Sequence, residues 1–176
     1  MYSDQLDITQ WTTAPLQITV TTRLNTSSDV AFQALSDPEM MCQLFSWMDN
    51  VTVAPSVVGG PLAVGVLRTC ILENGLVLEE EIVAWHPPQG YAYRGIDATH
   101  PFGMRGHVSA ISFVSHEDGC QIVWQHYFDH PNVSAMREQL KQSMNVAIDT
   151  LIRRFGSHRH QAGGPPRWQL KPETRG

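Results

Sequence analysis

Apolar and polar positions alternate through most of the chain, and this period of two residues is typical of β-strands. The sequence predicts a first strand over residues 16–24, followed by two short helices in the stretches TSSDVAFQALSD and DPEMMCQLFSWM. Six further strands are predicted at 51–57, 64–72, 76–86, 91–97, 104–115 and 120–128. Most of their connectors are too short for anything but antiparallel neighbours.

The last predicted element is a long helix. Its apolar side chains recur at spacings of three and four residues up to Gly156, a natural helix stop. They are Val133, Met136, Leu140, Met144, Ala147, Ile148, Leu151 and Phe155. A curved antiparallel sheet of about seven strands, wrapped on this helix, would bury the apolar faces of both. We therefore expect an α+β fold with two short helices after the first strand.

Two opposite charges fall within the apolar stripe of the predicted hairpin at residues 64–85. If its loop consists of residues 73–75, Arg68 faces Glu80 across the two strands. A two-residue Asn-Gly turn is the alternative, and it would place Arg68 opposite Glu81. In the first register a cation and an anion share the face that should be buried.

The strands at 104–115 and 120–128 add histidines to the same face. Their turn predicts that one face carries Arg105, His107, Ser109, Ile111 and Phe113 together with Ile122, Trp124, His126 and Phe128. Buried charged groups must pair, meet water or bind something polar. We therefore expect a partly solvated cavity into which Arg68, Glu80, His107 and His126 project.

Composition restricts the class of protein. The chain has 176 residues, of which 42% are hydrophobic and 16% charged, with a net charge of -5, as in a soluble single-domain protein. The negative charge argues against nucleic acid as a partner. Neither an apolar run long enough to span a bilayer nor a basic and then apolar leader is seen, so a cytoplasmic location without membrane insertion is expected.

The ends of the chain differ from its middle. Residues 1–15 lack periodicity, and residues 157–176 are rich in glycine, proline and charge, so both are predicted to be flexible. Residues 16–156 then form the folded domain. Cys42, Cys70 and Cys120 are far apart and indicate neither a disulfide framework nor a zinc site.

Several stretches, taken in order, resemble a known family. They are VTTRLNTSSDVAFQALSDPE, VGVLRTCILENGLVLEEEIVAWHPPQGYAYRG, HPF, GCQIVWQHYF and the long final helix, which together cover about residues 16–156. They are similar to the polyketide cyclase/dehydrase branch of the SRPBCC superfamily, which has the START or helix-grip fold. The matching positions are Gly65, Arg68, Glu80 (or Glu79), Tyr93, Pro101 and Trp124.

The resemblance implies a deep pocket between the sheet and the C-terminal helix that holds a hydrophobic small molecule. It does not imply one reaction, because the superfamily includes aromatic cyclases as well as lipid and hormone carriers. The ligand-binding residues expected on this basis are Cys70, Leu78, Tyr91, Tyr93, Trp124, His126, Phe128, Met136, Leu140 and Met144. The protein is expected to be a monomer or a homodimer.

Three residues are candidates for catalysis. Arg68 could stabilise an oxyanion while Glu80 moves a proton, and His107 could act as an acid or base near neutral pH. The structural alternatives are an ion pair that closes one end of the pocket and a hydrogen-bonded wall histidine. Both readings remain open from the residues alone.

No cofactor is expected. The potential metal ligands Asp97, His100, His107, His126, Asp129 and His130 show no recognised spacing, and G-x-S-x-G, Walker and Rossmann motifs are not found. The leading hypothesis is therefore a protein that binds a hydrophobic molecule. Its alternatives are a cyclase or dehydratase acting on a polyketide-like intermediate, a non-catalytic lipid carrier, and an interaction module that docks through the tail with Trp168.

Overall fold

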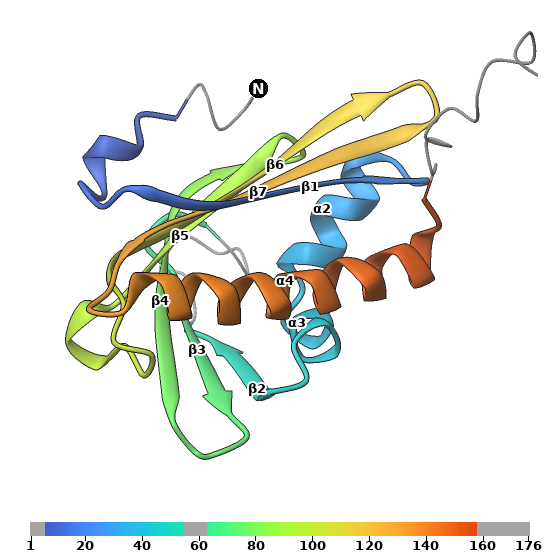
Figure 1. The fold of residues 1–176 in the computed structure, drawn as a ribbon. Coiled ribbons are helices and arrows are strands. Elements are labelled where there is room, and N and C mark those ends of the chain that lie inside the picture. Colours follow the sequence, from blue (N-terminus) through green and yellow to red (C-terminus); the bar gives the residue numbers. More distant parts are fainter. Residues whose placement is uncertain (1–5, 55–62, 158–176) are drawn as a thin grey trace, which may run out of the picture.

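The computed structural model describes residues 6–54 and 63–157. Within them, seven strands form one antiparallel sheet in the order β1-β7-β6-β5-β4-β3-β2 (Figure 1). The strands are β1 (Leu16–Leu24), β2 (Met48–Val53), β3 (Leu67–Leu72), β4 (Val77–His86), β5 (Gly90–Gly95), β6 (Arg105–His116) and β7 (Gly119–Asp129). From β2 to β7 each strand pairs with the next in sequence, and β1 closes the other edge against β7.

In the described part of the chain, three α-helices accompany the sheet: α2 (Ser28–Ser36), α3 (Pro38–Leu44) and α4 (Val133–Phe155). Ser27, Asp37 and Asn132 cap their N-termini, each accepting a hydrogen bond from a backbone N–H of the first turn. Helix α4 ends at Gly156, as the sequence predicts. Two short 3-10 helices, η1 (Ile8–Gln10) and η2 (Asp97–Thr99), lie in the segments before β1 and before β6.

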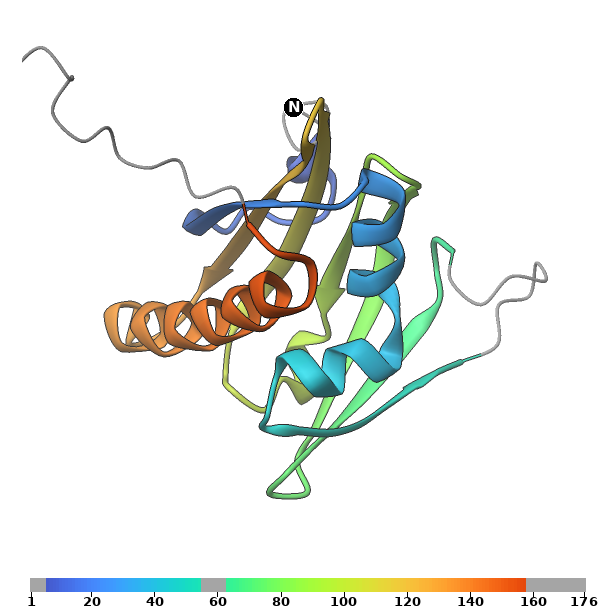
Figure 2. The same ribbon diagram turned by 90° about the vertical axis from the view of Figure 1, so that its right-hand side faces the viewer.

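The main core lies between the concave face of the sheet and the three helices (Figures 1 and 2). Helix α4 crosses this face and buries Met136, Met144, Ala147 and Leu151 against it. This confirms the predicted α+β architecture, in which a curved sheet wraps a long C-terminal helix and two short helices follow the first strand.

The opposite face of the sheet has a small core of its own. Ala84, Ala92 and Ala110 on β4, β5 and β6 are covered by Leu6, Ile8 and Trp11. These covering residues belong to the N-terminal segment that the sequence predicts to be flexible. Their packing on the sheet does not test this prediction, because the prediction concerns motion. The alanines leave room for the segment to lie close to the sheet.

The hairpin of β3 and β4 has the register of the longer loop. Arg68 pairs with Glu80, and the Leu72 N–H donates to the Leu76 carbonyl at 2.8 Å. The two-residue Asn-Gly alternative, which pairs Arg68 with Glu81, is therefore wrong.

Two other expectations need correction. The second short helix ends at Leu44 instead of continuing to Met48, because Met48 is recruited into β2 opposite Leu72. Strand β2 therefore begins earlier than predicted, and residues 55–57 of the predicted strand lie outside the described residues.

Arg105 does not share the inner face with His107. The register shifts between Arg105 and Val108, at Gly106, whose φ is +60°. This β-bulge inserts one residue, so Arg105 turns outward to pair with Asp129 while His107 points inward. Alternation alone could not show where the extra residue lies.

Candidate functional site

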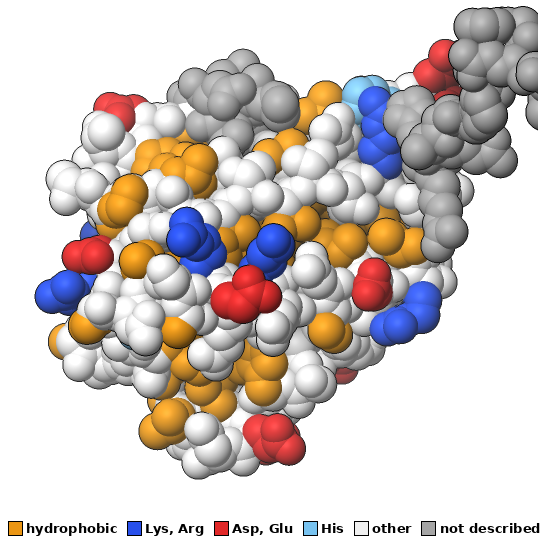
Figure 3. Space-filling model, viewed as in Figure 1, with side chains coloured by type: hydrophobic (Ala, Val, Ile, Leu, Met, Phe, Trp, Pro, Cys, Tyr) orange, Lys and Arg blue, Asp and Glu red, His pale blue; other side chains and the backbone are white. Residues whose placement is uncertain are grey.

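A cavity of about 430 Å³ lies between the sheet and α4. Its walls come from α3 and the turn after it, the tip of the β3–β4 hairpin, the inner faces of β4 to β7, the segment before β6, and the first half of α4. Most of its lining is apolar or aromatic: Met41, Phe45, Trp47, Met48, Leu72, Leu78, Tyr93, Phe102, Met104, Met136 and Leu140. The polar members are Glu73, Asn74, Glu80, His100, His107, His126, Gln139 and Ser143. Figure 3 shows apolar side chains gathered between α4 and the tip of this hairpin.

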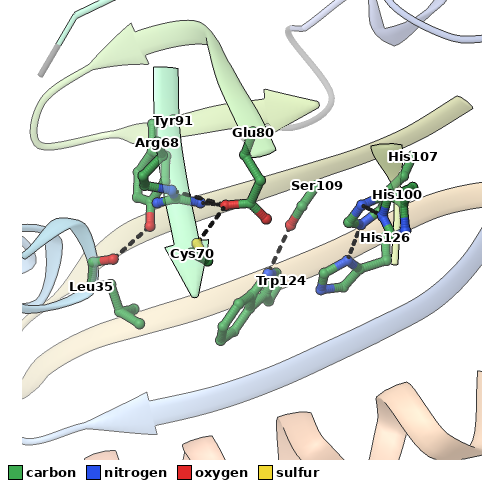
Figure 4. Close-up of polar contacts among 10 residues, drawn as sticks. All are labelled: Leu35, Arg68, Cys70, Glu80, Tyr91, His100, His107, Ser109, Trp124 and His126. Atoms are coloured by element: carbon green, nitrogen blue, oxygen red, sulfur yellow. Dashed lines mark hydrogen bonds and ion pairs between the residues drawn. The ribbon is translucent and has the colours of Figure 1, made fainter. Parts of the chain in front are cut away.

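The ion pair predicted at the hairpin is present and buried (Figure 4). Arg68 donates to Glu80 Oε2 from Nε at 2.9 Å and from Nη2 at 2.6 Å, and the arginine residue is 1% exposed. Its guanidinium also lies over the Tyr93 ring, 4.4 Å from the ring centroid. Burial is the largest single effect and lowers the pKa of Arg68, but Glu80 together with Tyr91, Tyr93 and Cys70 outweighs it and raises this pKa above its ordinary value.

Glu80 and Arg68 differ in their access to the cavity. Glu80 lines it, and the hydrogen bonds from Arg68 and Cys70 all reach the same oxygen, Oε2. Arg68 lies behind and does not line the cavity. Burial and the nearby Glu80 charge raise the pKa of the Cys70 thiol, which therefore stays protonated near neutral pH. The geometry gives Arg68 the position of a counter-ion for Glu80.

Other aromatic side chains support the cavity from outside. The Tyr91 hydroxyl donates to the Leu35 carbonyl at 2.6 Å, which ties β5 to α2, and burial raises the pKa of Tyr91 to about 12. Trp124 donates from Nε1 to Ser109 Oγ at 2.8 Å. Figure 4 shows both contacts. The polar atoms of Tyr91 and Trp124 therefore have hydrogen-bonding partners inside the protein.

Three buried histidines form a hydrogen-bonded chain along one wall of the cavity (Figure 4). His100 Nε2 lies 3.3 Å from His107 Nδ1, and His107 Nε2 lies 3.0 Å from His126 Nδ1. The rings of His107 and His126 are nearly parallel, with centroids 5.3 Å apart. The bulge at Gly106 helps to place His107 between its two neighbours.

Burial keeps all three imidazoles neutral. It lowers the pKa of His100 to about 4 and that of His126 to about 3. The pKa of His107 is lowered well below its ordinary value by burial and by the two neighbouring histidines. Near neutral pH these rings therefore act as hydrogen-bonding groups and are poor proton acceptors.

The predicted site residues separate into two groups. Seven line the cavity: Leu78, Glu80, Tyr93, His107, His126, Met136 and Leu140. Six others are buried in the core around it without lining it: Arg68, Cys70, Tyr91, Trp124, Phe128 and Met144. The first group faces the space where a ligand could bind, and the second holds that group in place.

Sequence reasoning missed several wall residues, of which His100 is the most important. The sequence indicates it only as one of the potential metal ligands, because it lies in a connector with no periodicity. Phe102 from the same connector packs on it, with ring centroids 5.9 Å apart. The HPF stretch that contains both residues is their signal in the sequence, and their proximity to His107 is a tertiary feature.

The potential metal ligands take other partners. Asp97 accepts from the Gly106 N–H, Asp129 pairs with Arg105, and His130 hydrogen-bonds the Phe102 carbonyl. Among residues 6–54 and 63–157, no group of three or more His, Cys, Asp or Glu side chains is placed to hold a metal ion. In the same residues, no helix is long and apolar enough to cross a membrane.

Solved structures with a similar fold are very different in sequence. Protein MLL2253 from Mesorhizobium loti is 15% identical, with a TM-score of 0.62 over 77% of this chain and 93% of that one. XoxI from Bacillus cereus is 12% identical, with a TM-score of 0.64 over 78% and 94%. The Aha1 dimer from Colwellia psychrerythraea is 12% identical, with a TM-score of 0.59 over 77% and 92%. At these identities the likeness concerns the fold alone.

A search of curated proteins gave no match. A family model does match, over residues 15–156, which include every strand and α-helix of the structure. The family is described as polyketide cyclase/dehydrase and lipid transport. Together with the curved sheet, the long final helix and the cavity between them, this match shows that the chain belongs to the polyketide cyclase/dehydrase and lipid transport family of SRPBCC proteins.

Proposed function

We propose that this protein binds a hydrophobic small molecule in the cavity between the sheet and α4. The observation that carries the proposal is the cavity itself, whose volume of about 430 Å³ falls within the range of roughly 300–1,000 Å³ usual for small-molecule sites. Its lining combines many apolar and aromatic side chains with a few polar ones, which is typical of such sites. Burial of an apolar ligand there would supply most of the binding free energy.

The polar groups support binding better than catalysis. An arginine that stabilises an oxyanion must reach the reacting atoms, whereas Arg68 is held by Glu80 behind the cavity wall. A general base works best when its pKa lies near the working pH, whereas the pKa values of His100 and His126 are about 4 and 3. A role as a carrier or sensor of the ligand fits these features.

A cyclase or dehydratase is the second candidate. One observation favours it, namely that the Glu80 carboxylate lines the cavity and takes its hydrogen bonds from the protein on one oxygen, Oε2. In such an enzyme Glu80 would move a proton on the bound substrate. Turnover of polyketide-like substrates that disappears in Glu80→Gln, while ligand binding persists, would support this candidate over the first.

Binding can be tested with N-phenylnaphthylamine, an uncharged dye whose fluorescence rises in apolar sites. We expect saturable binding by the natural protein. Ser143→Phe fills the cavity from α4, because Ser143 lines it, and should weaken dye binding by at least about tenfold, a loss of about 1.4 kcal/mol. Lys141→Phe, on the exposed side of the same helix, adds a matched aromatic ring outside the cavity.

The outcome of this pair of variants decides the proposal. Weakened binding in Ser143→Phe with unchanged binding in Lys141→Phe is the expected result. No binding by the natural protein, or equal binding by both variants, would overturn the proposal. Native mass spectrometry of the protein purified from its own host would then identify the natural ligand by mass.

A further inference from the structure

The hydrogen bonds that link the three histidines all run in the same donor-to-acceptor direction, and a backbone N–H determines this direction. The Phe102 N–H donates to His100 Nδ1 at 3.4 Å. Since a backbone N–H can only donate, His100 Nδ1 must be the acceptor nitrogen of its ring. In a neutral imidazole the proton is then on Nε2.

The same reasoning passes along the chain. His100 Nε2–H donates to His107 Nδ1, so the proton of neutral His107 is on its Nε2. His107 Nε2–H in turn donates to His126 Nδ1, so the proton of neutral His126 is also on Nε2. All three rings therefore have the same tautomer, and each N–H points away from Phe102.

The chain ends on a donor that the protein does not use. His126 is 3% exposed and lines the cavity, and its Nε2 is a buried atom with no hydrogen-bonding partner among the described residues. In Figure 4 this nitrogen lies on the side of the ring away from His107. Buried donors are nearly always paired in folded proteins, so an unpaired one in a cavity wall calls for a partner from the ligand.

We propose that the ligand carries an uncharged hydrogen-bond acceptor, such as the carbonyl oxygen of an aromatic ketone or quinone, and that His126 Nε2–H donates to it. This inference rests on the proposed function and specifies the chemistry of the ligand for the same cavity. His100 and His107 act as positioning residues, because they fix the tautomer of His126 without contacting the acceptor.

The charges around the cavity explain why the acceptor is uncharged. The three histidines are neutral, and the charges of Arg68 and Glu80 offset each other. Glu73, the other acidic residue of the lining, offers no counter-charge to an anionic acceptor. An ionised ligand group would find no counter-charge in the pair of Arg68 and Glu80, and burying an unpaired charge is costly. A ketone oxygen needs only a donor, which His126 provides.

The tautomers can be tested without any variant or ligand. Nitrogen-15 NMR of the histidine rings distinguishes a protonated Nε2 from a protonated Nδ1. At pH 7 we expect all three rings to be neutral and protonated on Nε2. A protonated Nδ1 on His126 would overturn the inference, because the nitrogen facing the ligand would then be an acceptor.

The ligand chemistry can be tested with fluorenone and fluorene, which have the same shape and differ in whether they carry a ketone oxygen. A net hydrogen bond predicts that the natural protein prefers fluorenone by roughly 3- to 10-fold. His126→Asn keeps an acceptor near the Nδ1 position for His107 but lacks the outer donor, so the preference should vanish. His126→Gln can place an amide N–H near the Nε2 position and should restore part of the preference.

The outcomes separate this inference from the proposed function. Equal affinity of the natural protein for the two compounds, or an unchanged preference in His126→Asn, would overturn the inference and leave binding intact. If neither compound binds while N-phenylnaphthylamine does, the inference is likewise overturned and the proposed function is left intact. If no apolar probe binds, the proposed function fails as well.

Discussion

Acidification from pH 7 to pH 5 should destabilise this protein through its three buried histidines. In the unfolded chain each histidine has an ordinary pKa of about 6.5 and becomes protonated over this range. In the folded protein burial lowers the pKa of His100 to about 4 and that of His126 to about 3, and it holds His107 well below its ordinary value. The unfolded state therefore binds more protons, and the free energy of unfolding must fall as the pH falls below about 6.5.

The size of the effect follows from linkage. Between pH 6.5 and pH 5 each histidine that protonates only when unfolded lowers the free energy of unfolding by about 2 kcal/mol, since one pH unit corresponds to about 1.4 kcal/mol. Three such groups give at most about 6 kcal/mol. His100 is the weakest contributor, because the Asp97 carboxylate opposes the effects of burial and of His130 on its pKa. The total is comparable to the whole stability of many domains, about 5–15 kcal/mol.

Urea unfolding at pH 7, 6 and 5, followed by circular dichroism, measures this loss. The variant His100→Phe keeps a ring of similar size and removes one titrating group, so its loss between pH 7 and pH 5 should be smaller by up to about 2 kcal/mol. Carboxylates of ordinary pKa change little over this range. A loss below about 1 kcal/mol in the natural protein would refute the conclusion that the three rings are buried and neutral.

Three substitutions test other features of the structure by urea unfolding at pH 7. Glu80→Ala leaves Arg68 buried without its counter-ion and should lower the free energy of unfolding by about 3–5 kcal/mol. Glu80→Gln keeps a hydrogen-bond acceptor for Arg68 and should lower it less. Equal losses in the two variants would contradict the importance of the hydrogen bonds. Tyr91→Phe removes the bond to the α2 carbonyl and should cost about 1–2 kcal/mol, and no change would show that the bond is not needed. Gly106→Ala should lower the free energy of unfolding by about 1–3 kcal/mol. The bulge needs a positive φ at this position, and a Cβ there would lie 2.7 Å from Thr12 Oγ1. Full stability of the variant would show that the bulge is dispensable.

The order and type of the elements could be predicted from the sequence because they depend on local patterns. Alternation specifies a strand, and apolar spacing of three and four residues specifies the helix that runs from Val133 to Phe155. The pairing of Arg68 with Glu80 followed from the same alternation once the length of the loop was chosen. Leu78, Glu80, His107 and His126 lie on the cavity wall because alternation assigns them to the inner face of the sheet. Met136 and Leu140 lie there because helical spacing puts them on the apolar face of α4, and Tyr93 was expected from the family resemblance.

Features that depend on distant segments could not be predicted. The bulge at Gly106 reverses the expected side of Arg105, and it involves contacts with Thr12 and Asp97 from two other segments. Met48 lies in β2 and not in α3, because it pairs with Leu72 of β3. In each case long-range hydrogen bonds override a local preference.

The sequence by itself determined the fold class and most of the inner face of the sheet, because these follow from side-chain periodicity along single elements. It placed Arg68 opposite either Glu80 or Glu81, and the structure decided for Glu80. Only the tertiary structure decided that Arg68 lies behind the cavity wall and that His100 joins His107 and His126. Periodicity tells which side of an element a residue occupies, but not how far its side chain reaches or which loop packs beside it. The free donor on His126 depends on a backbone N–H in such a loop, so its direction is a property of the folded chain.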